Sequence, residues 1–197
     1  LMNKLINAEI EKTILALSKL KDIESISIIQ QAVRICTSCL QRENKILLGG
    51  NGGSAADSQH MAAELVSRFN FDRPGLAAIA LTTDTSILTA IGNDYGFEKL
   101  FERQLQALGQ KGDVFIGVST SGNSPNIVNA LRYAQSAGIH TIGLSGNKEA
   151  AMHEYCDVSI KAPSSSTPKI QECHLVIEHI ICGLIESEIF GDSDCKQ

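Results

Sequence analysis

The chain lacks any apolar run approaching the ~20 residues that cross a bilayer, and it lacks an excess of positive charge. Its 17 lysine and arginine residues stand against 22 acidic residues, which gives a net charge of −5. This balance argues against a nucleic-acid-binding surface and against a basic membrane-binding patch. The first residues, LMNKLINAEIEK, lack the apolar core of a signal peptide. We therefore expect a cytoplasmic protein with no membrane or nucleic-acid partner.

The six cysteines do not form two facing pairs at the spacing of a zinc ribbon. Cys36 and Cys39 form a C-x-x-C, but they lie in a helical pattern whose apolar residues recur at positions 28, 29, 33, 36 and 40. Cysteine in such a stripe behaves as a small apolar residue. We predict buried thiols, which suit a reducing cytoplasm in a chain of this length.

The sequence does contain enough apolar residues, 43% of 197, to fill the core of one domain. After Asn44, short apolar runs alternate with helical stretches, which is typical of a parallel sheet covered on both faces. The expected strands are 45–50, 77–81, 113–118, 140–145 and 156–162, and the expected helices are near 54–70, 85–91, 96–108, 125–137 and 168–190. The sequence therefore predicts an α/β fold, a three-layer sandwich around a five-stranded parallel sheet. In the last helix, Thr167 is expected to be the cap and Pro168 to occupy the first turn.

Two amphipathic helices precede this pattern. We expect residues 1–44 to be a helical segment that packs on the domain and takes part in an oligomer interface. Residues 45–190 form the domain itself, and the tail, 191–197, has no periodicity and is expected to fray.

Two strand-end loops are the places to look for function, because ligands bind beyond the carboxyl ends of parallel strands. The first is GGNGGS at 49–54. Its glycines allow backbone N–H groups to approach an oxygen-rich ligand. The pattern Gly50-x-Gly52-x-x-Ala55 also meets the loose dinucleotide-binding fingerprint, although a tight turn needing glycine explains it equally well.

The second loop is STSGNSP at 119–125, again between a strand and a helix. Ser124 is expected to cap that helix, with Pro125 at its first position. Four hydroxyls beside a helix N-terminus form a cradle for a phosphate monoester, and they exceed what one cap needs. Neither loop contains G-K-[ST], which argues against a nucleoside triphosphate bound with magnesium.

The helices contribute further polar candidates. His60 and Glu64 lie about 40° apart on one face of their helix, close enough to share an ion or a substrate. Gln171 and His179 lie about 80° apart on the last helix. By themselves, these side chains fit a solvated helix face as well as a ligand site. His174 falls within the apolar stripe and is expected to be a packed core or interface residue.

Four segments together resemble the phosphoheptose isomerase family of the sugar isomerase (SIS) fold: GNGGS at 50–54, AIGNDYGF at 90–97, GVSTSGNS at 117–124 and IQECH at 170–174. The resemblance implies one zinc ion per subunit, with His60, Glu64, Gln171 and His179 as its ligands. It also implies an acid–base pair, Glu64 and His179. The implied substrate contacts are Asn51, Gly52, Gly53, Glu64, Asn93, Asp94, Ser119, Thr120, Ser121, Ser124 and Gln171.

The implied reaction interconverts sedoheptulose 7-phosphate and D-glycero-D-manno-heptose 7-phosphate through an enediol, as the first step toward activated bacterial heptose. The family commonly assembles as homotetramers, so the two ligand-bearing helices are expected to meet across a subunit boundary. One alternative is a noncatalytic SIS protein that binds a phosphosugar or a replication-initiator partner, but Glu64 and His179 favour an enzyme. Another is a dinucleotide-dependent oxidoreductase with Asp84 near the second strand, which leaves the serine loop unexplained.

Overall fold

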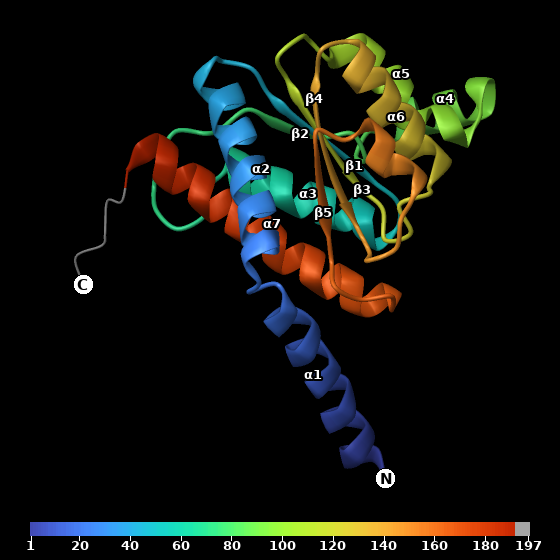
Figure 1. The fold of residues 1–197 in the computed structure, drawn as a ribbon. Coiled ribbons are helices and arrows are strands. Elements are labelled where there is room, and N and C mark those ends of the chain that lie inside the picture. Colours follow the sequence, from blue (N-terminus) through green and yellow to red (C-terminus); the bar gives the residue numbers. More distant parts are fainter. Residues whose placement is uncertain (192–197) are drawn as a thin grey trace.

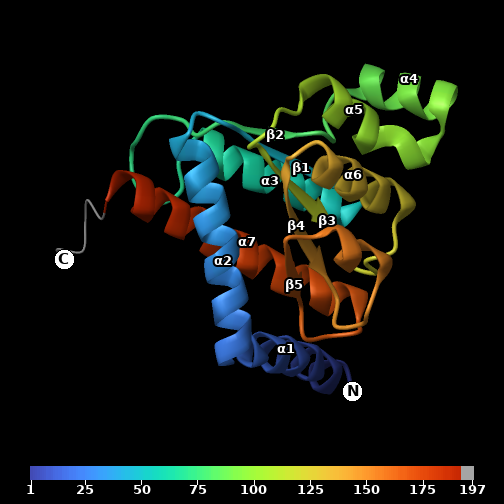
Figure 2. The same cartoon turned by 45° about the horizontal axis from the view of Figure 1, so that its top comes forward.

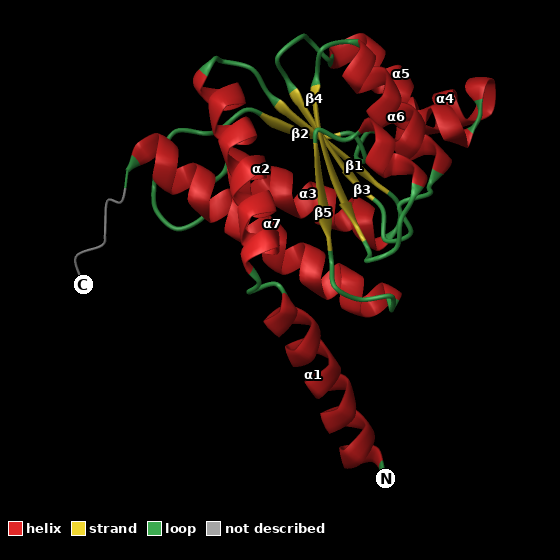
Figure 3. Cartoon of the chain, in the orientation of Figure 1, coloured by secondary structure: helices red, strands yellow, loops and turns green. Residues whose placement is uncertain are grey.

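The computed structural model describes residues 1–191 and shows a three-layer α/β sandwich, as predicted (Figure 1; Figure 3). The expectation that the tail, 191–197, frays concerns residues outside the described part of the chain, apart from Gly191. The strands are β1 (Ile46–Gly50), β2 (Ala78–Ala80), β3 (Val114–Val118), β4 (His140–Ser145) and β5 (Val158–Lys161). The α-helices are α1 (Met2–Lys19), α2 (Ile23–Gln41), α3 (Gly53–Val66), α4 (Thr85–Tyr95), α5 (Leu100–Leu108), α6 (Pro125–Ser136) and α7 (Thr167–Phe190). Short 3₁₀ helices span Phe97–Lys99 and Ala151–Tyr155, and the second was not anticipated.

The five strands are all parallel, in the order β2-β1-β3-β4-β5. The chain leaves β1 toward β2 on one side and returns to β3 on the other, so the strand order reverses between β1 and β3. Ligands of open α/β sheets bind at such a switch point, outside the carboxyl ends of the strands. The loops after β1 and β3, the two predicted from sequence, are therefore neighbours.

The helices divide between the two faces of the sheet. Helices α2, α3 and α7 cover one face, and α4, α5 and α6 lie on the other (Figure 1; Figure 2). Each face has its own apolar core: Leu48, Leu65 and Ile181 belong to the first, and Phe101, Phe115 and Leu131 to the second. Glycines 49, 117 and 143 lie within the strands, and a side chain at any of them would press on side chains of the second core.

The two leading helices behave differently. Helix α2 contributes Ile29, Val33 and Cys36 to the core, and Cys36 and Cys39 are buried as predicted. Burial raises the pKa of the Cys39 thiol to about 12. Helix α1 projects from the body of the molecule and buries one of its residues, Ala16 (Figure 1). Five of its large apolar residues are more than half exposed: Leu5, Ile6, Ile10, Ile14 and Leu15.

The start of α7 differs from the prediction in one detail. The helix begins at Thr167, so its N-cap is Ser166, and Thr167 and Pro168 occupy the first turn. The expectation that Thr167 caps the helix is wrong by one residue. Proline still suits its place, because the first helical N–H groups have no partner within the helix.

The described part of the chain has no helix with the length and apolar character of a membrane span. Five of its cysteines, Cys36, Cys39, Cys156, Cys173 and Cys182, are free thiols.

Candidate active site

The hydroxyl groups of the serine loop after β3 lie close to one another. Ser119 is buried, and its Oγ lies 3.0 Å from Ser124 Oγ and 3.5 Å from Ser121 Oγ. Gly122 takes φ +67° in the turn, a conformation that favours glycine. Pro125 opens α6 as predicted, and Ser124 stands at its N-cap. These hydroxyls converge at a helix N-terminus, which is the arrangement expected of an anion site.

The predicted role of Ser124 as a side-chain cap is wrong. Its hydroxyl pairs with Ser119 and makes no hydrogen bond to the first turn of α6, whose backbone groups bond instead to the Ser124 carbonyl oxygen. The side chain is therefore available to the loop.

The glycine loop after β1 is joined to the start of α6, directly after the serine loop, by a pair of side-chain amides. Asn51 Nδ2 donates to Asn126 Oδ1 at 2.9 Å, and Asn126 Nδ2 donates back to Asn51 Oδ1 at 2.8 Å. Asn126 lies in the first turn of α6 and is 1% exposed. Gly52 has φ +55°, and a side chain on Gly53 would collide with the Gln171 amide. Asn51, Gly53 and Gln171 thus lie close to the carboxyl end of β1, at the switch point of the sheet.

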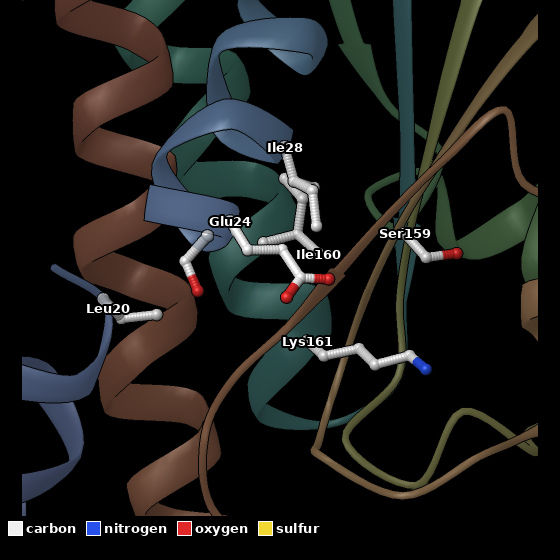
Figure 4. A pocket seen from close by; sticks show the side chains of 7 residues that line it. Leu20, Glu24, Ile28, Ser159, Ile160 and Lys161 are labelled. Carbon is white, nitrogen blue, oxygen red and sulfur yellow. The ribbon is translucent and has the colours of Figure 1, made fainter. Parts of the chain in front are cut away.

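A pocket of about 330 Å³ extends from the serine loop toward β5. The loops after β4 and β5 supply lining residues that the sequence analysis did not single out: Asn147, Lys148, Ser164 and Ser165. Each follows the carboxyl end of a strand, which was the available signal for finding them. A second groove of similar size lies between the start of α2 and the edge strand β5, and none of the predicted site residues lines it (Figure 4).

His60, Glu64 and His179 converge between α3 and α7. The two Nε2 atoms of His60 and His179 lie 2.8 Å apart, and Glu64 Oε1 lies 3.5 Å from His60 Nε2. Ligand atoms of all three residues fall within 4.8 Å of one another, and all three side chains are partly buried. Imidazole nitrogens and a carboxylate oxygen are an ordinary zinc donor set. The three residues fit the metal that the resemblance implied.

The fourth predicted ligand, Gln171, lies at a different level of α7 from His179. It lies beside Gly53, two helical turns before His179, a rise of about 12 Å along α7. Helices α3 and α7 run side by side in the same direction, so the pair Gly53–Gln171 stands at one end and the pair His60–His179 further along.

Asn93 and Asp94 lie on the opposite face of the sheet, exposed on α4, and Asn93 Nδ2 donates to Asp94 Oδ1 at 2.8 Å. Helix α4 buries none of its residues. The Asp84 carboxylate, the acidic residue that a dinucleotide site would use, caps α4 through the Ile87 N–H. One chain therefore brings together part of the predicted site but not Asn93 and Asp94.

Two residues that precede His179 on α7 are buried. His174 is fully buried as predicted, its Nε2 donates to the Ser145 carbonyl oxygen, and burial lowers its pKa to about 4. Glu178 is 1% exposed, and neither carboxylate oxygen has a hydrogen-bond partner among the described residues. Burial and then the nearby Asp57 carboxylate raise the pKa of Glu178 to about 8. The sequence pattern gave no sign of this buried acid.

The fold and the serine loop define the class of this protein: the SIS domain profile matches residues 11–146, and the chain belongs to the SIS domain proteins. It is 60% identical over 179 residues to phosphoheptose isomerase 2 of Campylobacter jejuni, a match that covers 90% of this chain and 89% of that protein. It is 57% identical to the phosphoheptose isomerase of Burkholderia pseudomallei over 93% of this chain and 92% of the relative. Within the class, the chain belongs to the phosphoheptose isomerase family, and it is a sugar-phosphate isomerase.

Solved structures agree with this assignment. The phosphoheptose isomerase of Neisseria gonorrhoeae superposes with a TM-score of 0.89 at 41% identity, covering 95% of this chain and all of the other. That of Francisella tularensis gives a TM-score of 0.91 at 35% identity over 95% of this chain and 99% of the other.

Proposed function

We propose that this isomerase interconverts sedoheptulose 7-phosphate and D-glycero-D-manno-heptose 7-phosphate, the first step toward activated heptose, and that it works in the cytoplasm, where its free thiols stay reduced. The observation that carries the proposal is the combination of a hydroxyl-rich phosphate cradle with a histidine–carboxylate–histidine cluster in one fold. A phosphate-binding SIS protein without catalysis needs the cradle but has no use for the cluster.

The chemistry moves a carbonyl between C1 and C2 of the open-chain sugar. A base carries a proton between these carbons through an enediol, while a second group moves protons on the two oxygens. Glu64 and His179 are a carboxylate and an imidazole on different helices, and both reach the same point. They form the acid–base pair in this proposal, and either can take the carbon proton.

Zinc, held by His60, Glu64 and His179 with Gln171 as a further ligand, would polarise the substrate oxygens and stabilise the charge of the enediol. The loop hydroxyls of Ser119, Thr120, Ser121 and Ser124 hold the phosphate and so fix the register of the sugar chain. Asn51, Gly52 and Gly53 contact the sugar from the glycine loop, and Asn93 and Asp94 contact it from α4.

The direct test is an assay with sedoheptulose 7-phosphate, with and without a chelator. Conversion to the aldose that chelation removes and added zinc restores supports the whole proposal. Conversion that persists after complete metal removal contradicts the zinc assignment but supports the proposed isomerase reaction. Tight binding of the sugar phosphate without conversion favours the noncatalytic alternative.

Loss of a loop hydroxyl should weaken binding more than it slows turnover. In Ser119→Ala and Ser121→Ala, we expect KM to rise by about tenfold, because each removes a hydrogen bond to a charged phosphate, and kcat to change little. Steady-state kinetics measure both constants, and Ser136→Ala, on the exposed end of α6, is a matched control. An unchanged KM in both variants, or equal turnover of unphosphorylated sedoheptulose, excludes the cradle.

We further propose that the site is completed in a homo-oligomer, a tetramer, with residues 1–44 in its interface and residues 45–190 as the catalytic domain. An apolar groove of about 420 Å³ runs between α1, α2 and α7, lined by Leu17, Ile29, Ile180 and Leu184. A second copy of the chain is the occupant that we propose for this groove. The groove is lined in part by α1, whose exposed apolar side chains extend the same apolar surface. Such packing also supplies a route for Gln171, Asn93 and Asp94 to reach the cluster of another subunit.

Removal of residues 1–22 should therefore reduce assembly and activity together, because the exposed apolar stripe of α1 is lost. Light scattering at the assay concentration measures the mass, and the isomerase assay measures the activity. Mixing two inactive variants, Gln171→Ala and His179→Ala, under subunit exchange should restore part of the activity if one site uses two subunits. A fully active monomer contradicts this proposal.

A further inference from the structure

A glycine in the interior of α7 leaves room for an aromatic ring. Gly183 lies well inside a helix of 24 residues, where glycine costs stability relative to alanine. A Cβ atom at this position would lie 3.1 Å from Phe69 Cε1 and 3.4 Å from Phe69 Cδ1. The first of these contacts is too short for the ring to keep its present place. The glycine therefore allows Phe69, from the segment after α3, to lie directly on α7.

The Phe69 ring contacts the functional cluster. Its centroid lies 5.6 Å from that of His179, with the planes tilted by 44°. His179 and Gly183 are four residues apart and so lie on the same face of α7. The His60 ring approaches His179 from another direction, with centroids 5.1 Å apart and planes at 68°. The His179 imidazole thus has one aromatic neighbour that is a ligand candidate and one that is apolar.

The backbone of Phe69 is fixed independently of its ring. Its N–H donates to Glu186 Oε1 at 2.9 Å, and the Asn70 N–H donates to Glu186 Oε2 at 2.6 Å. Glu186 is fully buried on α7 and also accepts from Arg73 Nε at 2.9 Å. The same Arg73 donates from Nη2 to the Glu64 carbonyl oxygen at 2.9 Å. The ring is therefore carried on a segment that is hydrogen-bonded to both ligand-bearing helices.

We propose that Phe69, seated against Gly183, is a positioning residue that fixes the orientation of the His179 imidazole toward His60 and Glu64. Imidazole has a broad torsional well about its ring bond, so the ring needs neighbours to hold one orientation. Phe69 supplies an apolar wall that makes no hydrogen bond to the imidazole nitrogens and leaves Nε2 free to face the cluster. The catalytic purpose of this orientation rests on the proposed function, whereas the orientation itself does not.

The test separates ring position from helix stability. Gly183→Ala favours the helix intrinsically but displaces the ring by a few tenths of an ångström. The control is Gly92→Ala in α4, where an added Cβ meets no atom within 4 Å. Zinc affinity is measured by competition with a chromophoric chelator, and cobalt-loaded protein reports the ligand geometry in its visible spectrum.

We expect zinc affinity to fall about tenfold in Phe69→Ala, as when the support of a metal-bound histidine is removed. In Gly183→Ala it should fall about two- to tenfold, the range for a side chain pushed off its preferred torsion. In the double variant, Gly183→Ala should add nothing, because no ring remains to be displaced. Gly92→Ala should bind zinc as the parent does. Parent-like affinity and cobalt spectra in both Phe69→Ala and Gly183→Ala overturn the proposal.

Metal-free protein gives a second readout that does not depend on the zinc assignment. The nuclear Overhauser contacts between the His179 and His60 rings, identified by their loss in His179→Gln, should weaken in Phe69→Ala and in Gly183→Ala and stay unchanged in Gly92→Ala. If the parent binds no zinc but these contacts weaken, the zinc proposal fails and the positioning inference holds. Unchanged contacts in both variants overturn the inference whatever the metal result.

Discussion

Glu64→Gln and His179→Ala should each lower kcat by at least about 100-fold, the lower end of what general acid–base catalysis contributes. Both residues belong to the cluster between α3 and α7 and are only partly buried. Losing either side chain opens no cavity in the core, so the urea midpoint should move little. Steady-state kinetics with sedoheptulose 7-phosphate and urea unfolding measure the two effects separately.

Glu188→Gln is the control for this pair, because it removes an exposed carboxylate from the same helix, away from the cluster. It should retain parental kinetics. Near-normal turnover in Glu64→Gln removes that residue from the acid–base pair, and the same result in His179→Ala removes the histidine. Loss of activity together with a large fall in the urea midpoint shows that the variant is defective in folding and not in catalysis.

Glu186→Ala should lower the free energy of unfolding by about 3–5 kcal/mol, because it leaves a buried charge without its partner. The carboxylate joins α7 to the Phe69 and Asn70 N–H groups and to the Arg73 side chain, which is 2% exposed. Urea unfolding of the parent and the variant measures the difference. Glu188→Ala, an exposed glutamate two residues further along α7, should change stability by less than about 0.5 kcal/mol.

The effect of Glu186 should depend on pH in a defined direction. Burial raises the pKa of this carboxyl, but the Asn70 and Phe69 N–H groups and Arg73 together hold the pKa below its ordinary value of 4.5. A carboxyl with a depressed pKa in the folded state stabilises the protein above the unfolded-state pKa. Its contribution is lost as the pH falls from 4.5 through the folded-state pKa. The gap between parent and Glu186→Ala should therefore be constant near neutrality and shrink in acid. A gap that widens below pH 4.5 contradicts this.

The order of strands and helices could be predicted from the sequence because it depends on local patterns. Apolar runs such as KILLGG and DVFIGV were too short for helices and were followed by helical periodicity, and each became a strand. Proline and hydroxyl residues marked the start of α6 for a local reason, the unpaired N–H groups of a first turn. The side-chain hydrogen bond of an individual helix cap was harder to predict. The Ser124 hydroxyl bonds to Ser119 and not to the helix, because the folded loop brings a second hydroxyl within reach.

Candidate site residues could be named from the sequence, but their arrangement in space could not. The serine loop and the helix pairs His60–Glu64 and Gln171–His179 stood out by spacing and by resemblance. Spacing along a helix says nothing of which helix lies beside it, and His60 and His179 are 119 residues apart. The reciprocal pair Asn51–Asn126 and the ion pair Arg73–Glu186 could not be predicted for the same reason.

The sequence by itself determined the class of fold and the two strand-end loops, because backbone propensity and hydrophobic period are properties of short segments. Only the tertiary structure decided that α3 and α7 run side by side in the same direction, which sets His60 against His179 and leaves Gln171 beside Gly53. That choice follows from burying the apolar faces of both helices on one face of the sheet, and a buried face is shared between segments that are remote in sequence.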